Sequence, residues 1–549
     1  MAKAKKQTLM FGAVILMLSN VVVKLIGAFL RIPLTNIIGV EGMAYYNAAY
    51  SIYVTFYTVS TAGIPVAVSR MIATAHSKNN HKEIKRIFNV AFALFFVIGV
   101  VGTAVMMIFA KQFASSAKMP DSFYAMLAIA PTIFFICLSS AYRGYFQGLQ
   151  NMTPTAVSQV IEAVAKFGIG ITAAIYFTSK GYPSHIVAAF VILGVTIGVL
   201  LGVIYGAITK SMFVSSSEYK NNLISCNSEC RKSKSILKEL VFIAIPITLA
   251  SSIMGLTNIF DTMMFASGLQ ETGLPEKAAT SYYGTYTSMV YPLFNLVPPF
   301  IYTFAISAIP AISSAVAVND REKASKDIES AFRNCALIAI PCAIGLASLS
   351  KRIIAFLFDN EDIVVAENVS VDAISIAAPA LSVISLGILF LGIISITNAV
   401  LQACKMERFT IISTASGVIV KIIAIYFLSR VPDFGLLGAA LSTVLCYFTI
   451  MCLNLFFMYT KTGFTLKISK IFIKPFASGI LCGAAALLVS GLMSNGRIGT
   501  LASIAAAVVV YVVVFVSLKG LNRYDVMMMP KGQKLCALLD RFNLLEKGE

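Results

Sequence analysis

The sequence predicts an all-α integral membrane protein with about 14 transmembrane helices. Of its 549 residues, 58% are hydrophobic and only 12% are charged, and the mean hydropathy is +0.83. A soluble domain carries about 25% charged residues. The apolar residues also come in runs of about 20 or more, the length at which a helix spans the hydrocarbon of a bilayer. These observations exclude an ordinary soluble enzyme and a disordered chain. They also argue against a nucleic-acid partner, despite a net charge of +18.

Fourteen apolar runs between polar breaks are long enough to cross a membrane. We expect each to be helical, because the open edges of strands cannot lie in lipid. Proline inside several of these runs predicts kinks. The predicted spans are 9–37, 44–75, 87–113, 122–149, 155–178, 184–209, 239–268, 279–316, 329–349, 371–402, 409–429, 434–460, 473–493 and 498–518.

The distribution of Lys and Arg predicts the orientation of the chain. An even number of spans places both termini on one side. If the N-terminus is cytoplasmic, the segments on that side carry 29 Lys and Arg, and the opposite loops carry 8. Cytoplasmic loops are enriched in these residues. Both termini are therefore predicted to be cytoplasmic, and the basic excess to meet anionic membrane lipids.

The second half of the chain resembles the first. The strongest match aligns Gln147 and Lys166 with Gln402 and Lys421, and the spacing from Gln to Lys is the same in both pairs. Because six spans separate the two copies, both have the same orientation, as in the parallel repeats of some transporters. The predicted organisation is an N-lobe at 1–210 (spans 1–6), a cytoplasmic linker loop at 211–236, a C-lobe at 237–462 (spans 7–12), two extra spans at 463–520 and a cytoplasmic tail at 521–549.

Several cations lie inside predicted spans, where a charge is costly and usually faces a cavity or a partner. Lys24 and Arg31 are seven residues apart and share one helix face, which predicts an anion-binding surface. Arg31 has a second interpretation, in which it reaches the outer membrane interface. Lys421 has no acid at helical spacing in its own span and is predicted to face a cavity.

Four further charged residues, at three places in the chain, have two interpretations at each place. Glu162 and Lys166 are four residues apart, so they either neutralise each other or leave Lys166 available to a cavity. Arg143 lies near the cytoplasmic end of its span and meets either headgroups or the rim of a cavity. Asp261, one turn after Asn258, is either part of a site for a small cation or proton, or the partner of a cation on a neighbouring span.

Tyrosines line one face of the second span at 46, 50, 53 and 57. Tyr53 and Tyr57 are the deeper pair, and they either line a cavity or pack against a neighbouring helix. Tyr286 in the eighth predicted span belongs to a similar group of tyrosines. A cationic, partly aromatic cavity would suit an anionic cargo. Because the sequence contains no catalytic constellation, no metal site and no phosphate-cradling loop, we do not expect an enzyme.

Several motifs resemble those of the multidrug/oligosaccharidyl-lipid/polysaccharide exporter superfamily, and more narrowly of SpoVB-like polysaccharide biosynthesis proteins and MurJ-type lipid II flippases. The resemblance covers about residues 8–520. The motifs are Lys24-Leu-Ile-Gly27 with Arg31-Ile-Pro33, Gly63-Ile-Pro65, Tyr142-Arg143-Gly144-Tyr145-Phe146-Gln147-Gly148 and Asn258-Ile-Phe-Asp261-Thr262.

The resemblance implies alternating access of two lobes around a central cationic cavity. The cargo would be an undecaprenyl-pyrophosphate-linked saccharide, with the peptidoglycan precursor lipid II as the first choice. Lys24 and Arg31 match the flippase cations associated with pyrophosphate, and Asp261 matches one side of an ion site. Tyr57 and Tyr286 stand near positions where better-known flippases carry Arg, which is a departure from the pattern.

We also expect a monomer in the bacterial cytoplasmic membrane, without a cofactor but with Na+ or H+ as the candidate coupling ion. The alternative cargoes are another lipid-linked polysaccharide unit or a sporulation-cortex precursor. A cation-coupled multidrug antiporter of the same fold is a further alternative. The excess of Lys and Arg in the predicted cavity disfavours it, because a cationic drug would need acids.

Overall fold

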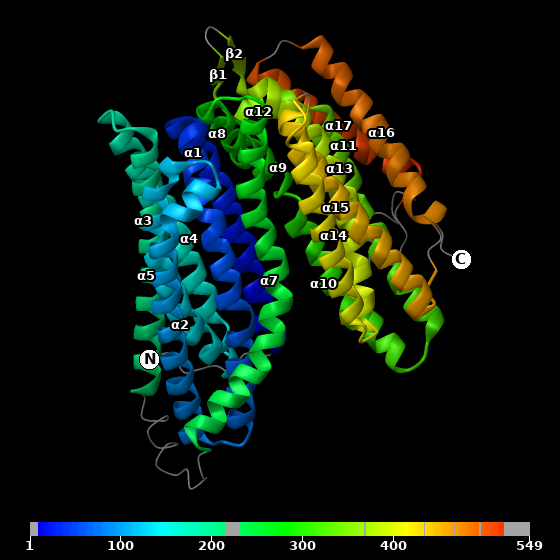
Figure 1. Ribbon diagram of the computed structural model, residues 1–549. Coiled ribbons are helices and arrows are strands. Elements are labelled where there is room, and N and C mark those ends of the chain that lie inside the picture. The colour runs from blue at the N-terminus through cyan, green and yellow to red at the C-terminus, as the bar shows by residue number, and fades with distance from the viewer. Residues whose placement is uncertain are drawn as a thin grey trace. The chain divides into compact units, whose positions relative to one another are not determined.

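The computed structural model describes residues 9–215, 231–366, 369–432, 434–465, 468–493 and 496–520. Within these ranges the chain is almost entirely helical (Figure 1). It divides into two compact units, Met1–Ser288 and Met289–Glu549, which are described separately below. The predicted tail at 521–549 and most of the predicted linker lie outside the described residues.

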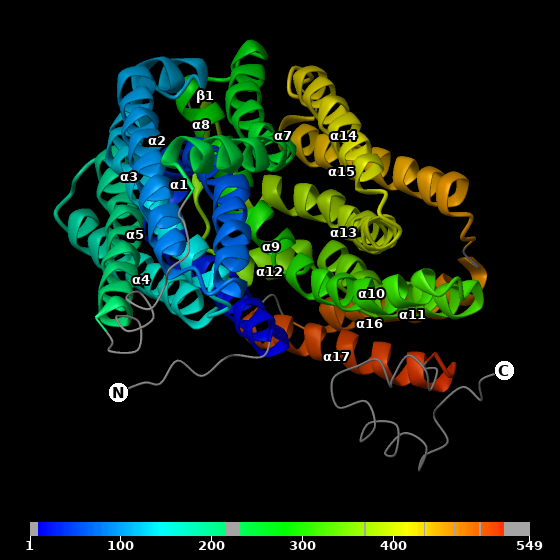
Figure 2. The same ribbon diagram turned by 90° about the horizontal axis from the view of Figure 1, so that it is seen from below.

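The first unit is built around a long helical segment, α1 (Leu9–Ser77), which contains the first two predicted spans. The two arms of α1 meet at Gly39, whose φ of 72° and ψ of 172° break the helix. Glycine adopts a positive φ without steric cost, so it can redirect the chain here. The other helices of this unit are α2 (His81–Ser116), η1 (Pro120–Ser122), α3 (Phe123–Gly148), α4 (Thr153–Ser179), α5 (Ser184–Val214), α7 (Ser233–Glu271) and α8 (Glu276–Thr285). In the view of Figure 2, α2 to α5 and α7 lie around α1, which contacts each of them.

The second unit has the same kind of helical packing and one small hairpin. A π-helix, η2 (Tyr286–Val290), runs from the first unit into the second. The other elements are α9 (Tyr291–Phe294), α10 (Pro298–Ala317), α11 (Arg321–Ser348), α12 (Ser350–Leu357), β1 (Asp362–Ala366), β2 (Val369–Asp372), α13 (Ala373–Ala403), α14 (Glu407–Leu428), α15 (Gly435–Phe457), η3 (Met458–Thr462), α16 (Ile468–Leu492) and α17 (Arg497–Ser517). The antiparallel pair β1–β2, with Ile363 opposite Val371, was not predicted.

Twelve helical segments among the described residues are long and apolar enough to cross a membrane. One of them, Leu18–Ser77, covers most of the first predicted span and all of the second, and α7 is not among the twelve. The eighth predicted span is divided among α8, η2, α9 and α10, because the π-turn and Pro298 interrupt it. The count of fourteen spans therefore stays a prediction, whereas the multi-pass helical architecture is confirmed.

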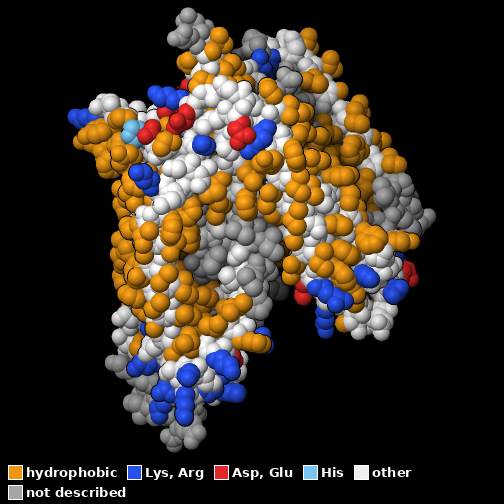
Figure 3. Space-filling model, viewed as in Figure 1, with side chains coloured by type: hydrophobic (Ala, Val, Ile, Leu, Met, Phe, Trp, Pro, Cys, Tyr) orange, Lys and Arg blue, Asp and Glu red, His pale blue; other side chains and the backbone are white. Residues whose placement is uncertain are grey.

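The outer faces of the helices are apolar, as lipid contact requires. Along α2, large hydrophobic side chains such as Val97 and Ile108 are exposed. In the face of the first unit shown in Figure 3, hydrophobic side chains cover the middle of the helices, and Lys and Arg lie at both ends, most densely at the lower one. The positive-inside rule makes the end richer in Lys and Arg the cytoplasmic one, and the orientation of the chain stays a prediction.

The predicted repeat reappears in the turns of the two units. Asn79 and Asn319 both have a positive φ, of 52° and 56°. The next residue in each turn, Asn80 or Asp320, caps the following helix by accepting a hydrogen bond from a backbone N–H three residues on. The neighbour relations α2–α3, α3–α5 and α4–α5 also recur as α11–α13, α13–α15 and α14–α15.

The compact units do not coincide with the predicted lobes. Helix α7, placed by the repeat in the C-lobe, packs within the first unit. Near its start, Ile236, Leu240 and Ala244 are buried in a cluster that includes residues of α1, α2 and α3. Helix α5 also extends to Val214 and α7 starts at Ser233, so both helices enter the predicted linker at 211–236. The predicted lobes divide the chain by its internal repeat, whereas the compact units divide it by the contacts between helices. The lobe boundaries stay predictions.

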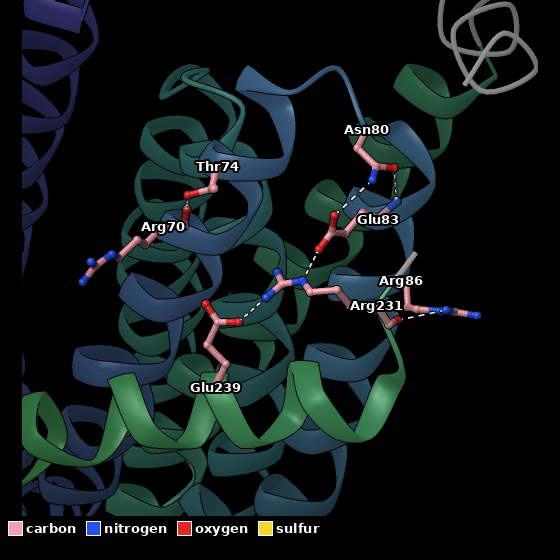
Figure 4. A network of polar contacts seen from close by, with 7 residues as sticks. All are labelled: Arg70, Thr74, Asn80, Glu83, Arg86, Arg231 and Glu239. Carbon is pink, nitrogen blue, oxygen red and sulfur yellow. Dashed lines mark hydrogen bonds and ion pairs between the residues drawn. The ribbon is translucent and has the colours of Figure 1, made fainter. Parts of the chain in front are cut away.

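A polar network fixes the start of α7 against the turn between α1 and α2 (Figure 4). Arg231 pairs with Glu83 at the start of α2 and with Glu239 in the second turn of α7. Asn80 holds Glu83 in place: its Oδ1 accepts from the Glu83 backbone N–H at 3.0 Å, and its Nδ2 donates to the Glu83 carboxylate at 3.1 Å. The hydrogen bond to Glu83 is the main cause that raises the pKa of Arg231 above its ordinary value. The guanidinium therefore stays charged, and the network joins elements that are far apart in the chain.

Candidate functional site

The tyrosine face predicted on the second span forms a continuous ladder along the second arm of α1. The ring centroids of Tyr46 and Tyr50 are 5.8 Å apart, those of Tyr50 and Tyr53 are 5.6 Å apart, and those of Tyr53 and Tyr57 are 6.0 Å apart. Tyr46 and Tyr53 are buried. These spacings lie in the range of favourable aromatic contacts. The ladder spans roughly three helical turns inside the first unit.

Arg143 and Glu162 form a buried ion pair beside the lower rungs of this ladder. Arg143 Nη2 donates to Glu162 Oε1 at 2.5 Å, and the two side chains are only 8% and 15% exposed. Ser139 Oγ donates to the same carboxylate oxygen at 3.4 Å. The Tyr57 hydroxyl also interacts with the guanidinium. Of the two predicted surroundings of Arg143, the lipid headgroups are therefore wrong, because the Arg143 side chain is buried in the helical bundle. The other, the rim of a cavity, stays a prediction.

Lys166 lies one turn further along α4 and faces the upper rungs of the ladder. Its Nζ is 4.6 Å from the centroid of the Tyr50 ring, a distance typical of cation–π contact. Tyr46 is close enough to the same ammonium to interact with it. Of the two alternatives for Glu162 and Lys166, the structure shows that Glu162 pairs with Arg143 on another helix. Glu162 is therefore engaged by Arg143, and the Lys166 ammonium contacts the aromatic face.

A stripe of glycines on α5 makes room for this pair. A Cβ atom added at Gly202 would lie 2.4 Å from Glu162 Oε1, and one added at Gly198 would lie 2.8 Å from the Glu162 carbonyl oxygen. Only glycine allows α5 to approach the acidic side chain this closely. The four-residue spacing of Gly194, Gly198, Gly202 and Gly206 is visible in the sequence and is typical of close helix contacts in membranes. This signal could have revealed the pocket for Glu162.

Arg31 is held by a backbone carbonyl that the π-turn provides. Its Nη1 donates to the carbonyl oxygen of Thr287 at 2.8 Å. The amide of Asn47 donates to the hydroxyl of Thr287 at 3.1 Å and so fixes that turn. A π-turn displaces carbonyls from the regular helical pattern and is frequent at functional sites. The guanidinium of Arg31 also lies near the ladder, since Arg31 interacts with Tyr46 and Tyr50.

The remaining predicted contact residues are Lys24, Tyr286 and Lys421. Lys24 is exposed on the first arm of α1. Tyr286 is buried and packs on Phe265 of α7, with ring centroids 5.8 Å apart. Lys421 is buried on α14 in the second unit, with 7% of its surface exposed. The cluster thus unites Arg31, Tyr53, Tyr57, Arg143 and Lys166.

Asp261 and Asn258 lie on α7 beside a chain of hydroxyls. Thr262 Oγ1 is 2.7 Å from Ser51 Oγ on α1 and 3.0 Å from the Tyr283 hydroxyl on α8. It also donates to the backbone carbonyl of Asn258 at 2.8 Å. The arrangement brings oxygen atoms of three helices together next to Asp261. Among the described residues, no group of three or more His, Cys, Asp and Glu side chains could hold a metal ion.

A family model described as polysaccharide biosynthesis protein matches residues 9–316, more than half of the chain. The chain belongs to this family. Among curated relatives, it is 27% identical to Stage V sporulation protein B of Bacillus subtilis (strain 168) over 96% of this chain and 98% of the relative. It is also 22% identical to Lipid II flippase MurJ of the same organism, over 84% of each chain.

Solved structures with the same fold are transporters. A structure of Lipid II flippase MurJ in an inward closed conformation aligns with a TM-score of 0.64 at 16% identity, over 91% of this chain and 98% of the other. A multidrug resistance MATE family transporter of the MOP superfamily, in an inward-facing conformation, aligns with a TM-score of 0.58 at 15% identity, over 84% of this chain and 95% of the other. The family member described here is therefore a multi-pass membrane protein with a transporter fold. Its functionally named relatives are flippases and transporters, not enzymes.

Proposed function

We propose that this protein is a flippase that moves an undecaprenyl-pyrophosphate-linked saccharide across the bacterial cytoplasmic membrane by alternating access, with lipid II as the first-choice cargo. The observation that carries the proposal is the buried cation–tyrosine cluster of the first unit. Arg143 and Lys166 flank a four-tyrosine ladder, and Arg31 lies near its upper end.

The chemistry of the cluster suits the headgroup of such a lipid. Arginine binds phosphate oxygens with two parallel hydrogen bonds, and lysine supplies a point charge. Tyrosine rings offer apolar faces to sugar rings and hydroxyls to their polar edges. Three cations against one carboxylate leave a net positive cluster, and a buried positive cluster favours an anionic cargo. A drug exporter for cationic cargo would need the opposite balance, which disfavours the multidrug antiporter.

The similarity to named relatives supports two candidate cargoes. Lipid II flippase MurJ matches over 84% of the chain, which supports a lipid-linked precursor of peptidoglycan. Stage V sporulation protein B has the higher identity, so a sporulation-cortex precursor is the second candidate cargo. Lys24, Tyr286 and Lys421 are proposed to contact the cargo at other stages of the transport cycle.

The proposed coupling ion is Na+ or H+, bound at Asp261 and Asn258. The support is the group of oxygen atoms that α1, α7 and α8 supply beside Asp261. We further propose that the protein acts as a monomer with both termini in the cytoplasm. The support for this orientation is the excess of Lys and Arg in the segments on that side.

The test is complementation of a bacterial strain depleted of its lipid II flippase. Wild-type protein should restore growth and lipid II translocation. Lys24→Ala and Arg31→Ala should fail while inserting into the membrane at wild-type levels, because each removes a cation that the pyrophosphate needs. Lys180→Ala, which changes an exposed loop lysine, is the matched control and should complement. Normal growth of both the Lys24→Ala and the Arg31→Ala strain, or failure of the wild type to translocate lipid II, would contradict the proposal.

A further inference from the structure

The internal repeat provides a comparison that isolates the role of the Arg143–Glu162 pair. The turn after α3 and the turn after α13 have the same geometry. In both, a residue with positive φ (58° at Gln150, 60° at Lys405) donates its N–H to a glutamine carbonyl three residues earlier, Gln147 or Gln402. The register of the repeat is therefore fixed at this point, and Arg143 corresponds to Asn398.

The second unit makes the equivalent contact without charges. Asn454 of α15 donates to Asn398 Oδ1 at 2.7 Å and to Thr397 Oγ1 at 3.2 Å. In the same register, Glu162 corresponds to Gly417. Asn454 lies almost as far from the start of α15 as Gly202 lies from the start of α5. In the first unit, the partner of Arg143 is the carboxylate of Glu162 on α4. In the second unit, the partner of Asn398 is the uncharged amide of Asn454 on α15, the counterpart of α5.

Packing alone therefore does not require an ion pair at this place in the fold. Asn454 is fully buried, and its amide bridge joins α13, the counterpart of α3, to α15. A buried ion pair is seldom more stabilising than an uncharged arrangement of similar shape, because both charges must be desolvated. The charges at Arg143 and Glu162 therefore require an explanation other than stability.

We infer that Glu162 is a specificity-determining residue, which occupies Arg143 so that singly charged phospholipid headgroups cannot bind there, while a doubly charged pyrophosphate headgroup can displace it. The inference rests on the proposed function, since it assumes a pyrophosphate lipid as cargo. A cationic cluster inside a bilayer is surrounded by anionic phospholipids, which are far more abundant than any lipid-linked precursor. Discrimination against an abundant competitor needs a feature that disfavours that competitor.

The Glu162 carboxylate meets this need because it matches a phosphodiester. Both carry one negative charge and two oxygens that a guanidinium can bind. Replacing the Glu162 carboxylate by a phosphodiester at Arg143 therefore gains little binding free energy. It also leaves Glu162 buried without its cation, which costs free energy. A pyrophosphate carries two charges on adjacent phosphates. It can therefore bind Arg143 and a second cation together, and Lys166 lies one turn, about 6 Å along α4, from Glu162.

The experiment measures binding of three lipid probes to the purified full-length protein in uncharged detergent. The probes are undecaprenyl pyrophosphate, phosphatidylglycerol with one charge, and zwitterionic phosphatidylethanolamine. For the wild type we expect pyrophosphate to bind more tightly than phosphatidylglycerol. Glu162→Gln should strengthen phosphatidylglycerol binding about tenfold or more, because a charge-assisted competitor has been removed. Pyrophosphate binding should strengthen as well, since it displaces the same carboxylate. Phosphatidylethanolamine binding should not change.

Two further variants keep the test decisive. Glu162→Asp retains the charge and should fold, but it withdraws the carboxylate from Arg143 by one methylene, so we expect a smaller gain in phosphatidylglycerol affinity. Asn454→Ala removes the equivalent bridge of the second unit and should lower stability without changing phosphatidylglycerol affinity. Unchanged phosphatidylglycerol affinity in Glu162→Gln, or in Glu162→Asp if Glu162→Gln does not fold, would overturn the inference. If the wild type binds no pyrophosphate, the proposed function fails instead.

Discussion

The strength of the Arg143–Glu162 pair can be tested by a double-mutant cycle on stability. The perturbations are Arg143→Gln, Glu162→Gln and the double replacement, each of which removes charge and keeps a polar side chain. The distance between Arg143 Nη2 and Glu162 Oε1 is 2.5 Å, and both side chains are largely buried. At an effective dielectric constant of about 20, the Coulomb attraction is about 7 kcal/mol, most of which offsets the desolvation of the two ions.

The cost of each single replacement follows from what it leaves behind. Arg143→Gln leaves a buried carboxylate, and losing the partner of a buried ion typically costs about 3–5 kcal/mol. The destabilisation of Arg143→Gln has an upper limit, because the unpaired Glu162 carboxylate can take up a proton. At pH 7, protonating a carboxyl with an ordinary glutamate pKa costs about 3.7 kcal/mol, and at pH 5 only about 1 kcal/mol. Arg143→Gln should therefore be destabilised by about 3 kcal/mol at pH 7 and by much less at pH 5.

The other two variants should behave differently. Glu162→Gln leaves a guanidinium that cannot lose its proton, so its destabilisation should not fall as the pH is lowered. The double variant resembles the amide bridge of the second unit and should be within about 1 kcal/mol of the wild type. The assay is equilibrium unfolding in mixed micelles at both pH values. If Arg143→Gln costs no more at pH 7 than an ordinary surface substitution, about 0.5 kcal/mol, the reasoning is refuted.

Two further predictions concern helix packing in the first unit. Gly202→Ala places a methyl group 2.4 Å from the Glu162 carboxylate. It should therefore cost about 1–3 kcal/mol of unfolding free energy. It should also strengthen phosphatidylglycerol binding, whereas Gly168→Ala, with open space around its Cβ position, should do neither. Arg231→Ala should detach the start of α7 from α2, because it removes both ion pairs of that network. Faster proteolysis or faster hydrogen exchange near residue 236 would report the detachment, and exchange as slow as in the wild type would contradict it.

Much of the helical framework could be predicted because membrane length constrains it. Apolar runs of about 20 residues have few alternatives in lipid, and the predicted ranges fall on helices in both units. The spacing of the tyrosines also predicted a single face, and the ladder confirms it. The break in the eighth span was missed because a π-turn leaves little trace in hydropathy. The β1–β2 hairpin was missed because its strands are only 5 and 4 residues long.

The partners of the charged residues were harder to predict for a physical reason. Helical periodicity shows which residues share a face, but it does not show which helix that face meets. Glu162 has Lys166 at the favourable four-residue spacing on its own helix, yet its partner is Arg143 on α3. The decisive factor is the glycine stripe of α5, which opens space for the carboxylate beside α3. A small-residue stripe opposite a charged residue is therefore the sequence feature that would have favoured the correct pairing.

The contrast between the two units also limits what the repeat can mean for function. If both units handled the headgroup in the same way, the position of Arg143 would carry a cation in both, but the second unit has Asn398 there. Lys166 and Lys421, by comparison, are lysines at equivalent positions. The repeat thus retains one cation in each unit and confines the second cation, with its carboxylate, to the first. We therefore expect selectivity for the headgroup to reside in the first unit, so that charge changes at Arg143 alter which lipid binds, whereas Asn398→Ala alters stability alone.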